Sequence, residues 1–339
     1  MFRLDKKLAR IRSGKYRRTD FIIADAKDPD MGPSIQSAGP ARQPDGAFTR
    51  YRTRAEFLDQ IKAVIAQDIV DVMLTSVSNL EQLVTADAFE GSNVKPAIRA
   101  NDTTDIWVGR GMGYAKHPSR PFRSASLSHV RFGSKGRSAR VKPYLTDLGL
   151  YSITFTNDID GDVASLKAFR DFRADAEAND FQYFLEVFNP NVPTGVAPET
   201  LPHFINDSIA RCLAGLTEAE RPQFLKIAYN GPKAMEELSS YDPSLVVGVL
   251  GGGAGTTRDC FELIHQAEKS GARVALFGRK INLAESPLAM VRAMRAVADG
   301  DLSPLDAVKA YHGDLKKEKI RANRELDADS EITESVLKI

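Results

Sequence analysis

Apolar runs of strand length alternate with longer helix-like segments along most of this chain, and this alternation restricts its fold more than any other feature. Strands that are each followed by a helix pack as a parallel sheet covered by helices. Eight units match a closed (β/α)8 TIM barrel, because open doubly wound sheets usually have five or six strands. We therefore predict an α/β TIM barrel with strands at DFIIADA (20–26), VDVMLTSV (70–77), KPAIRAN (95–101), LYSITFTN (150–157), FQYFLEVFN (181–189), FLKIAYN (224–230), LVVGVLGG (245–252) and ARVALFGR (272–279).

Residues 1–339 are predicted to form a single barrel domain with its core at about 18–300. A long polar insertion, residues 101–143, follows the third strand in place of a helix. It is expected to lie over the C-terminal mouth of the barrel, where this fold places its active sites. Residues 301–339 are predicted to be a helical extension that frays into a mobile tail.

Charge and composition argue against several classes of partner. The formal net charge is +1, and the apolar share of 42% is ordinary for a globular protein. Neither a nucleic acid nor a membrane is therefore predicted as a partner. The basic N-terminus, MFRLDKKLARIRSGKYRR, is interpreted as a leading amphipathic helix rather than a transit peptide or a nucleic-acid arm. Its apolar face would carry Phe2, Leu4, Leu8 and Ile11.

Two cysteines, Cys212 and Cys260, lie in helical patterns without metal-type spacing, and they are expected to be packed thiols in a reducing compartment. No run of about 18 apolar residues and no signal-peptide pattern occurs in the sequence. The sequence therefore predicts a cytoplasmic protein, and a homo-oligomer is expected because closed homo-oligomers are common among soluble enzymes.

A single lysine, Lys226, interrupts the sixth apolar run. Alternation along a strand places it on the inward face with Phe224, and it places Glu186 on the inward face of the neighbouring fifth strand. A desolvated lysine that has lost its proton is a nucleophile that forms Schiff bases with carbonyl groups. The alternative is a structural Lys–Glu ion pair in the barrel core. By the same reasoning, Asp25 and Lys27 are predicted to share the inward face at the end of the first strand.

The turns after the last two strands suggest a phosphate site. Gly251, Gly252 and Gly253 precede a helix that begins near Thr256, and Gly278 and Arg279 end the eighth strand; the usual phosphate site of this barrel is formed by these two loops. Glycine amides, a helix N-terminus and an arginine all favour an anion. A tight structural loop is the alternative, and a dinucleotide-binding motif is disfavoured because the G-x-G-x-x-G spacing is absent.

No cofactor or metal ion is predicted. The cluster Asn101-Asp102-Thr103-Thr104-Asp105 carries oxygen ligands that a divalent cation accepts, but these residue types also dominate polar turns, which is the preferred interpretation. No two of the five histidines show the spacing of metal ligands.

Taken together, these stretches resemble the class I, Schiff-base aldolases of the tagatose-bisphosphate, sulfofructose-phosphate and deoxyribose-phosphate aldolase group. The resemblance covers residues 1–295 without the insertion, and it is carried by IIADAK, ITFTNDID, FLEVFN, FLKIAYNG and LGGGAGTT with ALFGR in the order typical of the family. It implies that Lys226 forms the Schiff base, that Glu186 moves protons and that Asp25 orients the substrate. It further implies substrate or phosphate contacts at Lys27, Gly252, Gly253, Gly278 and Arg279.

Three positions depart from the family pattern. Asp25-Ala26-Lys27 stands in place of Asp-Gln-Arg, Ser152 falls where a strand-four lysine is expected, and Gly251 replaces a serine. The resemblance implies a lyase that makes or cleaves a carbon–carbon bond in a ketose phosphate or a related keto-sugar. A transaldolase- or thiolase-like transferase that uses the same lysine, or a non-catalytic sugar-phosphate-binding barrel, is the alternative.

Overall fold

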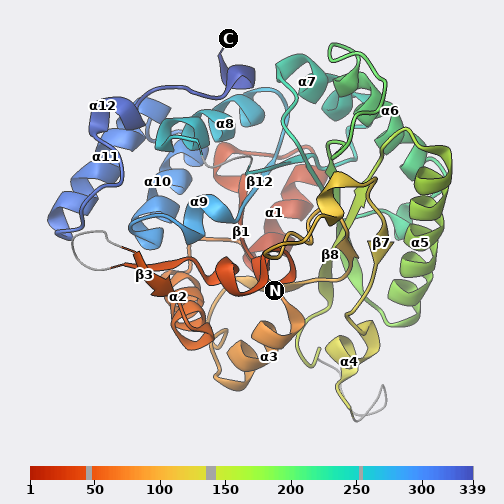
Figure 1. The fold of residues 1–339 in the computed structure, drawn as a ribbon, viewed down its shortest axis with the longest axis horizontal. Helices are drawn as coiled ribbons and strands as arrows, with labels where there is room; N and C mark the ends of the chain where they lie inside the picture. Colours follow the sequence, from red (N-terminus) through yellow and green to blue (C-terminus); the bar gives the residue numbers. More distant parts are fainter. Residues whose placement is uncertain (43–47, 135–142, 252–254, 339) are drawn as a thin grey trace.

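The computed structural model describes residues 1–42, 48–134, 143–251 and 255–338 (Figure 1). Within these residues, parallel strands close into one barrel. Its eight strands are β1 (Ile22–Lys27), β4 (Val72–Thr75), β5 (Lys95–Arg99), β8 (Leu148–Thr154), β9 (Gln182–Phe188), β10 (Leu225–Ile227), β11 (Gly248–Leu250) and β12 (Val274–Phe277).

The strands follow one another around the barrel in chain order, and β12 returns to pair with β1. Ile22 of β1 lies opposite Val274 of β12, which closes the sheet without a free edge. The (β/α)8 barrel predicted from the alternation of apolar runs is thereby confirmed. Each of the eight predicted runs overlaps one barrel strand, although β8 begins two residues before its run and β1 ends one residue after its run.

Helices surround the barrel, and Figure 1 shows them arranged around the central strands. Several begin with side-chain caps, such as Thr53 before α2 and Thr256 before α8, each with an acidic residue three positions later that completes a capping box. The helices are α1 (Arg3–Arg12), α2 (Arg54–Gln67), α3 (Val77–Thr85), α4 (Leu127–Phe132), α5 (Ile159–Ala178), α6 (Leu201–Leu213), α7 (Pro232–Tyr241), α8 (Thr257–Lys269), α9 (Arg279–Asn282), α10 (Pro287–Asp299), α11 (Pro304–Lys317) and α12 (Leu326–Asp329).

Two apolar cores lie on the two faces of the sheet. The inner core contains inward-facing residues of six strands, such as Ile22 and Phe184, together with Phe224 and Val246, which precede β10 and β11, and Leu4 and Leu8 of α1. The outer core lies between the strands and the surrounding helices. The predicted leading helix is therefore confirmed, and its apolar face packs on the inner core.

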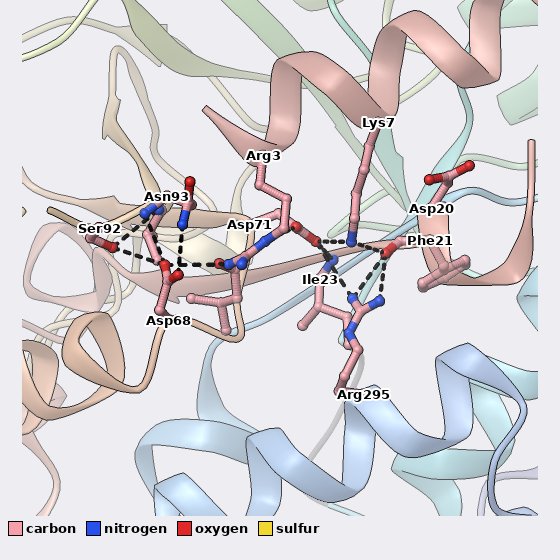
Figure 2. Close-up of polar contacts among 12 residues, drawn as sticks. Arg3, Lys7, Asp20, Phe21, Ile23, Asp68, Asp71, Ser92, Asn93 and Arg295 are labelled. Atoms are coloured by element: carbon pink, nitrogen blue, oxygen red, sulfur yellow. Dashed lines mark hydrogen bonds and ion pairs between the residues drawn. The ribbon is translucent and has the colours of Figure 1, made fainter. Parts of the chain in front are cut away.

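An ion-pair cluster around Asp71 fixes α1 to the barrel (Figure 2). Asp71 is fully buried and precedes β4, and its carboxylate accepts hydrogen bonds from Arg3 Nε (2.8 Å) and Lys7 Nζ (2.9 Å). Arg295 of α10 lies 3.5 Å from the same carboxylate, which also accepts the backbone N–H of Ile23. The cluster therefore joins the first helix, two strands and α10 at the amino-terminal end of the barrel.

Residues 135–142 of the predicted insertion lie outside the described residues. The rest of the insertion contacts the loop after β9 at the mouth of the barrel. It contains β6 (Asp102–Thr103), β7 (Pro121–Phe122) and α4. The N–H of Thr104 donates to the carbonyl of Arg120 and closes the segment on itself. Asn191, in the loop after β9, donates to the carbonyls of Ala115 and His117.

The C-terminal extension packs against α8, so the prediction that it frays is wrong for the residues up to 338. Thr333 Oγ1 donates to Asp259 of α8 at 2.5 Å, and Gln266 Nε2 donates to the carbonyl of Leu337 at 2.9 Å. The N–H of Thr257 donates to Asp329 Oδ1 at 2.8 Å. These contacts hold the tail along α8.

Both cysteines are buried and unpaired, as predicted. Burial raises the pKa of each thiol to about 12, so neither has the character of a reactive thiolate. Among the described residues, no helix combines the length and the apolar character needed to span a bilayer.

Candidate active site

A cavity of about 540 Å³ opens at the carboxyl ends of the barrel strands. Its floor is formed by inward-facing side chains, including Glu186 of β9 and Lys226 of β10. The loop after β1, the insertion and the start of α9 form its rim. Its size and position are those of a small-molecule site in this fold.

Lys226 and Glu186 meet on the floor of this cavity. They are register partners on adjacent parallel strands, and Lys226 Nζ forms an ion pair with Glu186 Oε1. Glu186 is 1% exposed and Lys226 is 7% exposed, so both side chains are largely shielded from solvent, and both still border the cavity. The predicted inward orientation of both side chains is confirmed. Below them, Phe184 and Phe224 stack with ring centroids 4.5 Å apart and close the floor.

Arg99 and Ser152 hold the other oxygen of Glu186. Ser152 Oγ donates to Glu186 Oε2 at 2.7 Å, and Arg99 Nη2 lies 3.3 Å from the same oxygen. Arg99 also donates to Ser152 Oγ (2.9 Å) and to Asp28 Oδ2 (2.6 Å). The carboxylate therefore has one oxygen bonded to the protein and one directed at Lys226.

Burial alone would lower the pKa of Arg99, but the carboxylates of Asp28 and Glu186 raise it above its ordinary value. Arg99 thus remains a fixed cation on the floor of the cavity. Neither Arg99 nor Asp28 was predicted as a site residue. The signal for Arg99 was the same as for Lys226, since it is a lone charge in the apolar part of a strand run, KPAIRAN.

Asp25 and Lys27 lie outside the cavity, and the prediction that they face inward is wrong. Ala24 and Ala26 belong to the inner core, so alternation directs Asp25 and Lys27 toward the outer core. Both are fully buried, and their charged groups are 3.4 Å apart. Among the described residues, neither the carboxylate of Asp25 nor the Nζ of Lys27 makes a hydrogen bond of good geometry. They form a buried ion pair between β1 and the helices, and Asp28 is the strand-one acid that lines the cavity.

The Asp25–Lys27 pair predicts a pH dependence of stability. Burial raises the pKa of Asp25 to about 6, against the opposing effect of Lys27, and burial lowers the pKa of Lys27. Because the folded protein binds this proton more tightly than the unfolded chain does, the contribution of Asp25 is largest below pH 4 and is lost as the pH rises through about 6.

Asp25→Asn removes this titration and keeps the shape of the side chain. Between pH 4.5 and 7, the free energy of unfolding of the wild type is expected to fall by about 2 kcal/mol relative to the variant. Urea unfolding of both proteins at the two pH values measures this difference. A constant difference would show that Asp25 is ionised in the folded protein across this range.

The predicted phosphate residues divide into two groups. Gly251, Gly278 and Arg279 line the cavity, whereas Gly252 and Gly253 lie outside the described residues. Two backbone N–H groups at the start of α8 already donate to carboxylates of the protein. The N–H of Thr256 donates to Asp259, and the N–H of Thr257 donates to Asp329. An anion near the last two strands would therefore contact the loops and Arg279 rather than these two amides.

The polar cluster 101–105 makes hydrogen bonds within the protein. Asn101 exchanges hydrogen bonds with the backbone of Ser152, at 2.6 and 2.8 Å. Asp105 accepts from Ser119 and Thr154, both at 2.9 Å, and it borders the cavity. These contacts join the cluster to β8 and to Ser119. The cluster also contains a turn, in which the N–H of Ile106 donates to the carbonyl of Thr103.

Comparison with known proteins relates the barrel to aldolases. No protein-family model matches the sequence, and no curated protein matches it. Among solved structures, a Schiff-base-forming fructose-1,6-bisphosphate aldolase is 17% identical with a TM-score of 0.59, over 87% of this chain and 99% of the other.

Two further structures agree with this likeness. An archaeal fructose 1,6-bisphosphate aldolase is 16% identical with a TM-score of 0.61, over 88% of this chain and 99% of the other. A fructose-bisphosphate aldolase from Slackia heliotrinireducens is 13% identical with a TM-score of 0.64, over 92% and 90%. At these identities the comparisons show the fold, a TIM barrel of the kind found in these aldolases.

Proposed function

We propose that this protein is a class I aldolase that makes or cleaves a carbon–carbon bond through a Schiff base on Lys226. The observation that supports this most strongly is the pairing of Lys226 with Glu186 on the floor of an open cavity. A purely structural ion pair has no need of a cavity at the lysine. The barrel is of the kind found in Schiff-base aldolases, and a fold hosts many functions, so the site itself carries the proposal.

The geometry suits imine chemistry. The amine of Lys226 attacks the ketone carbon after it transfers a proton to Glu186 Oε1, and the resulting carbinolamine loses water when the same carboxyl returns the proton to the hydroxyl. Arg99 and Ser152 keep Glu186 Oε2 occupied, so the proton is exchanged at Oε1, the oxygen that faces the reacting atoms.

Bond cleavage then follows from the electron demand of the iminium ion. Glu186 removes the proton of the hydroxyl on the β-carbon, the bond between the α- and β-carbons breaks, and its electrons form an enamine. The aldehyde half leaves, a proton is returned to the α-carbon of the enamine, and water hydrolyses the iminium to release the ketone. In the reverse direction the enamine adds to an aldehyde.

The ketone half is proposed to carry a phosphate group. Arg279 and Gly278 border the cavity at the end of β12, in the position where this barrel commonly binds phosphate. A guanidinium group binds phosphate through two parallel hydrogen bonds. A ketose phosphate such as dihydroxyacetone phosphate would place its carbonyl group toward Lys226.

Borohydride reduction tests the proposal, because it converts the Schiff base into a stable secondary amine. The protein is incubated with dihydroxyacetone phosphate and, separately, with pyruvate, reduced and mapped by peptide mass spectrometry. We expect an adduct on Lys226. Lys7 is a matched internal control, because burial lowers its pKa to about 8 but it lies in the Asp71 cluster, away from the cavity. An adduct on neither lysine, or equally on both, would contradict the proposal.

Ser152 is expected to act as a positioning residue for Glu186. Ser152→Ala removes the 2.7 Å hydrogen bond to Oε2 and frees the carboxylate to rotate. We expect kcat to fall about 10- to 100-fold with little change in KM, since proton transfer depends on the placement of its base. Thr154→Val is the control, because it removes a hydroxyl group two residues along the same strand that bonds Asp105 instead. Equal effects of the two variants on kcat would contradict the role of Ser152.

A further inference from the structure

The cavity has a charged floor and a largely apolar rim. Asp28, Arg99, Glu186 and Lys226 occupy the floor on the side of β1, β5, β9 and β10. Above them, toward the opening, the cavity is lined by apolar side chains from five separate segments: Pro33, Ile106, Val108, Phe188, Leu250 and Leu283. Phe188 follows Glu186 by two residues on the same face of β9, so it lies about 6–7 Å nearer the opening.

Part of this apolar rim is exposed to solvent. Val108 is 44% exposed and Leu283 is 43% exposed, although both border the cavity. Exposed apolar side chains that converge on a cavity commonly contact a ligand. They belong to different parts of the chain, the insertion and the segment after α9, so no single local packing requirement accounts for both.

Several contacts hold the part of the insertion that lines the rim. The carbonyl of Ile106 lies against Gly32, where an added Cβ would come within 2.9 Å of it. Asp105, beside Ile106, is fixed by Ser119 and Thr154. Asn191, in the loop after β9, also donates a hydrogen bond to this segment. These contacts hold the backbone that places Val108 at the cavity.

The rim has few side-chain groups that are available to form hydrogen bonds with the hydroxyl groups of a sugar. Both oxygens of Asp105 already accept hydrogen bonds from the protein. The Nε2 of Gln36 and the Nδ2 of Asn282, which also line the cavity, donate to Tyr51 and to the carbonyl of Ser37. The buried Oδ1 of Asn282 has no hydrogen-bond partner among the described residues, and it could receive a single hydroxyl group. A polyhydroxylated aldehyde would leave water and place its hydroxyl groups against apolar carbon, which is unfavourable unless each finds a partner.

We infer that the aldehyde half of the substrate is apolar, an alkyl or aryl aldehyde rather than a hydroxylated sugar aldehyde. The inference rests on the proposed Schiff base at Lys226. The ketone half would occupy the floor, and the aldehyde half would contact the apolar rim. With the ketone held at Lys226 and Glu186, the new bond projects from the floor toward Phe188 and Val108. This choice of acceptor distinguishes the protein from enzymes that cleave sugar bisphosphates.

A homologous series of acceptors tests the inference. The ketone that borohydride traps on Lys226 is supplied as donor, and kcat/KM is measured for ethanal, propanal, butanal and pentanal, with glyceraldehyde and glyceraldehyde 3-phosphate for comparison. We expect kcat/KM to rise about threefold to fourfold per added methylene, the value for burial of one such group. We expect pentanal to exceed both hydroxylated aldehydes. A flat series, or a preference for a hydroxylated aldehyde, would overturn the inference.

Two variants locate the effect. Val108→Asp is expected to lower kcat/KM for pentanal at least about tenfold, since it places a charge against the alkyl chain, while trapping of the donor on Lys226 is unchanged. Val163→Asp is the matched control, because Val163 is 43% exposed on α5 and does not line the cavity. Equal effects of the two variants would overturn the assignment of the rim. Loss of donor trapping in the wild type would instead contradict the Schiff base itself, so the two failures are distinguishable.

Discussion

Lys226→Met is expected to abolish catalysis, with a loss of kcat on the order of 10⁴-fold or more, because Lys226 is the only lysine among the described residues that line the cavity. Arg99 and Asp28 also line the floor, but a guanidinium stays protonated and a carboxylate forms no imine. The aldol addition of the trapped donor to its best acceptor measures the loss. Borohydride reduction should yield no adduct on the variant.

The same variant is expected to remain folded. Glu186 keeps Ser152 and Arg99 as hydrogen-bond partners when the ammonium is removed, so its carboxylate is not left without a donor. Methionine also fills most of the volume of the lysine stem. Lys7→Met is the matched control, since it removes another buried lysine at the other end of the barrel and is expected to reduce stability while kcat is retained. Full activity of Lys226→Met would refute the mechanism.

Asp71→Ala is expected to destabilise the fold by about 3–5 kcal/mol, the cost typical of breaking a buried ion pair from one side. The variant leaves the N–H of Ile23 without its side-chain acceptor and leaves Lys7 with the carbonyl of Phe21 alone. Arg3 and Arg295 lose their common counter-charge. Urea unfolding measures the change. The kcat of the folded variant should be unaffected, because the cluster lies at the end of the barrel opposite the cavity.

Asp68→Asn provides the comparison for Asp71. Asp68 lies 3.5 Å from Arg3, but its side chain is 32% exposed. Asparagine also tolerates the left-handed backbone conformation of this residue, at φ 53°. A change below about 1 kcal/mol is therefore expected, as for a surface ion pair. Equal free energies of unfolding for the two variants would show that the burial of Asp71 does not determine its contribution to stability.

The barrel and the pairing of Lys226 with Glu186 were predictable from the sequence because each depended on a simple periodicity. Alternation within FLKIAYN and FQYFLEVFN places Lys226 and Glu186 on one face, and sequential strand order makes those strands neighbours. The same periodicity failed for the first strand. DFIIADAKD carries charges on both faces, and the prediction took Asp25 and Lys27 as the inward face, although Ile22, Ala24 and Ala26 are the residues of this strand that face the inner core.

The remaining contacts depend on long-range structure that no local pattern records. Arg99, Ser152 and Asp28 come from three different segments, and they meet only because the barrel closes. The insertion is irregular, so its sequence gave no periodicity from which to place Val108 at the cavity. The packing of the tail on α8 likewise depends on single polar contacts, such as that of Thr333 with Asp259.

Closure of the barrel between its first and last strands has a consequence for synthesis on the ribosome. Ile22 finds its partner Val274, and Asp71 receives Arg295, only after nearly the whole barrel has been translated. Until then the nascent chain carries an open sheet with two unpaired edges and a buried carboxylate that lacks one of its cations. Fragments that stop before α10 are therefore expected to be incompletely packed and prone to aggregation. The barrel becomes a closed, fully paired sheet only after β12 and α10 have been translated.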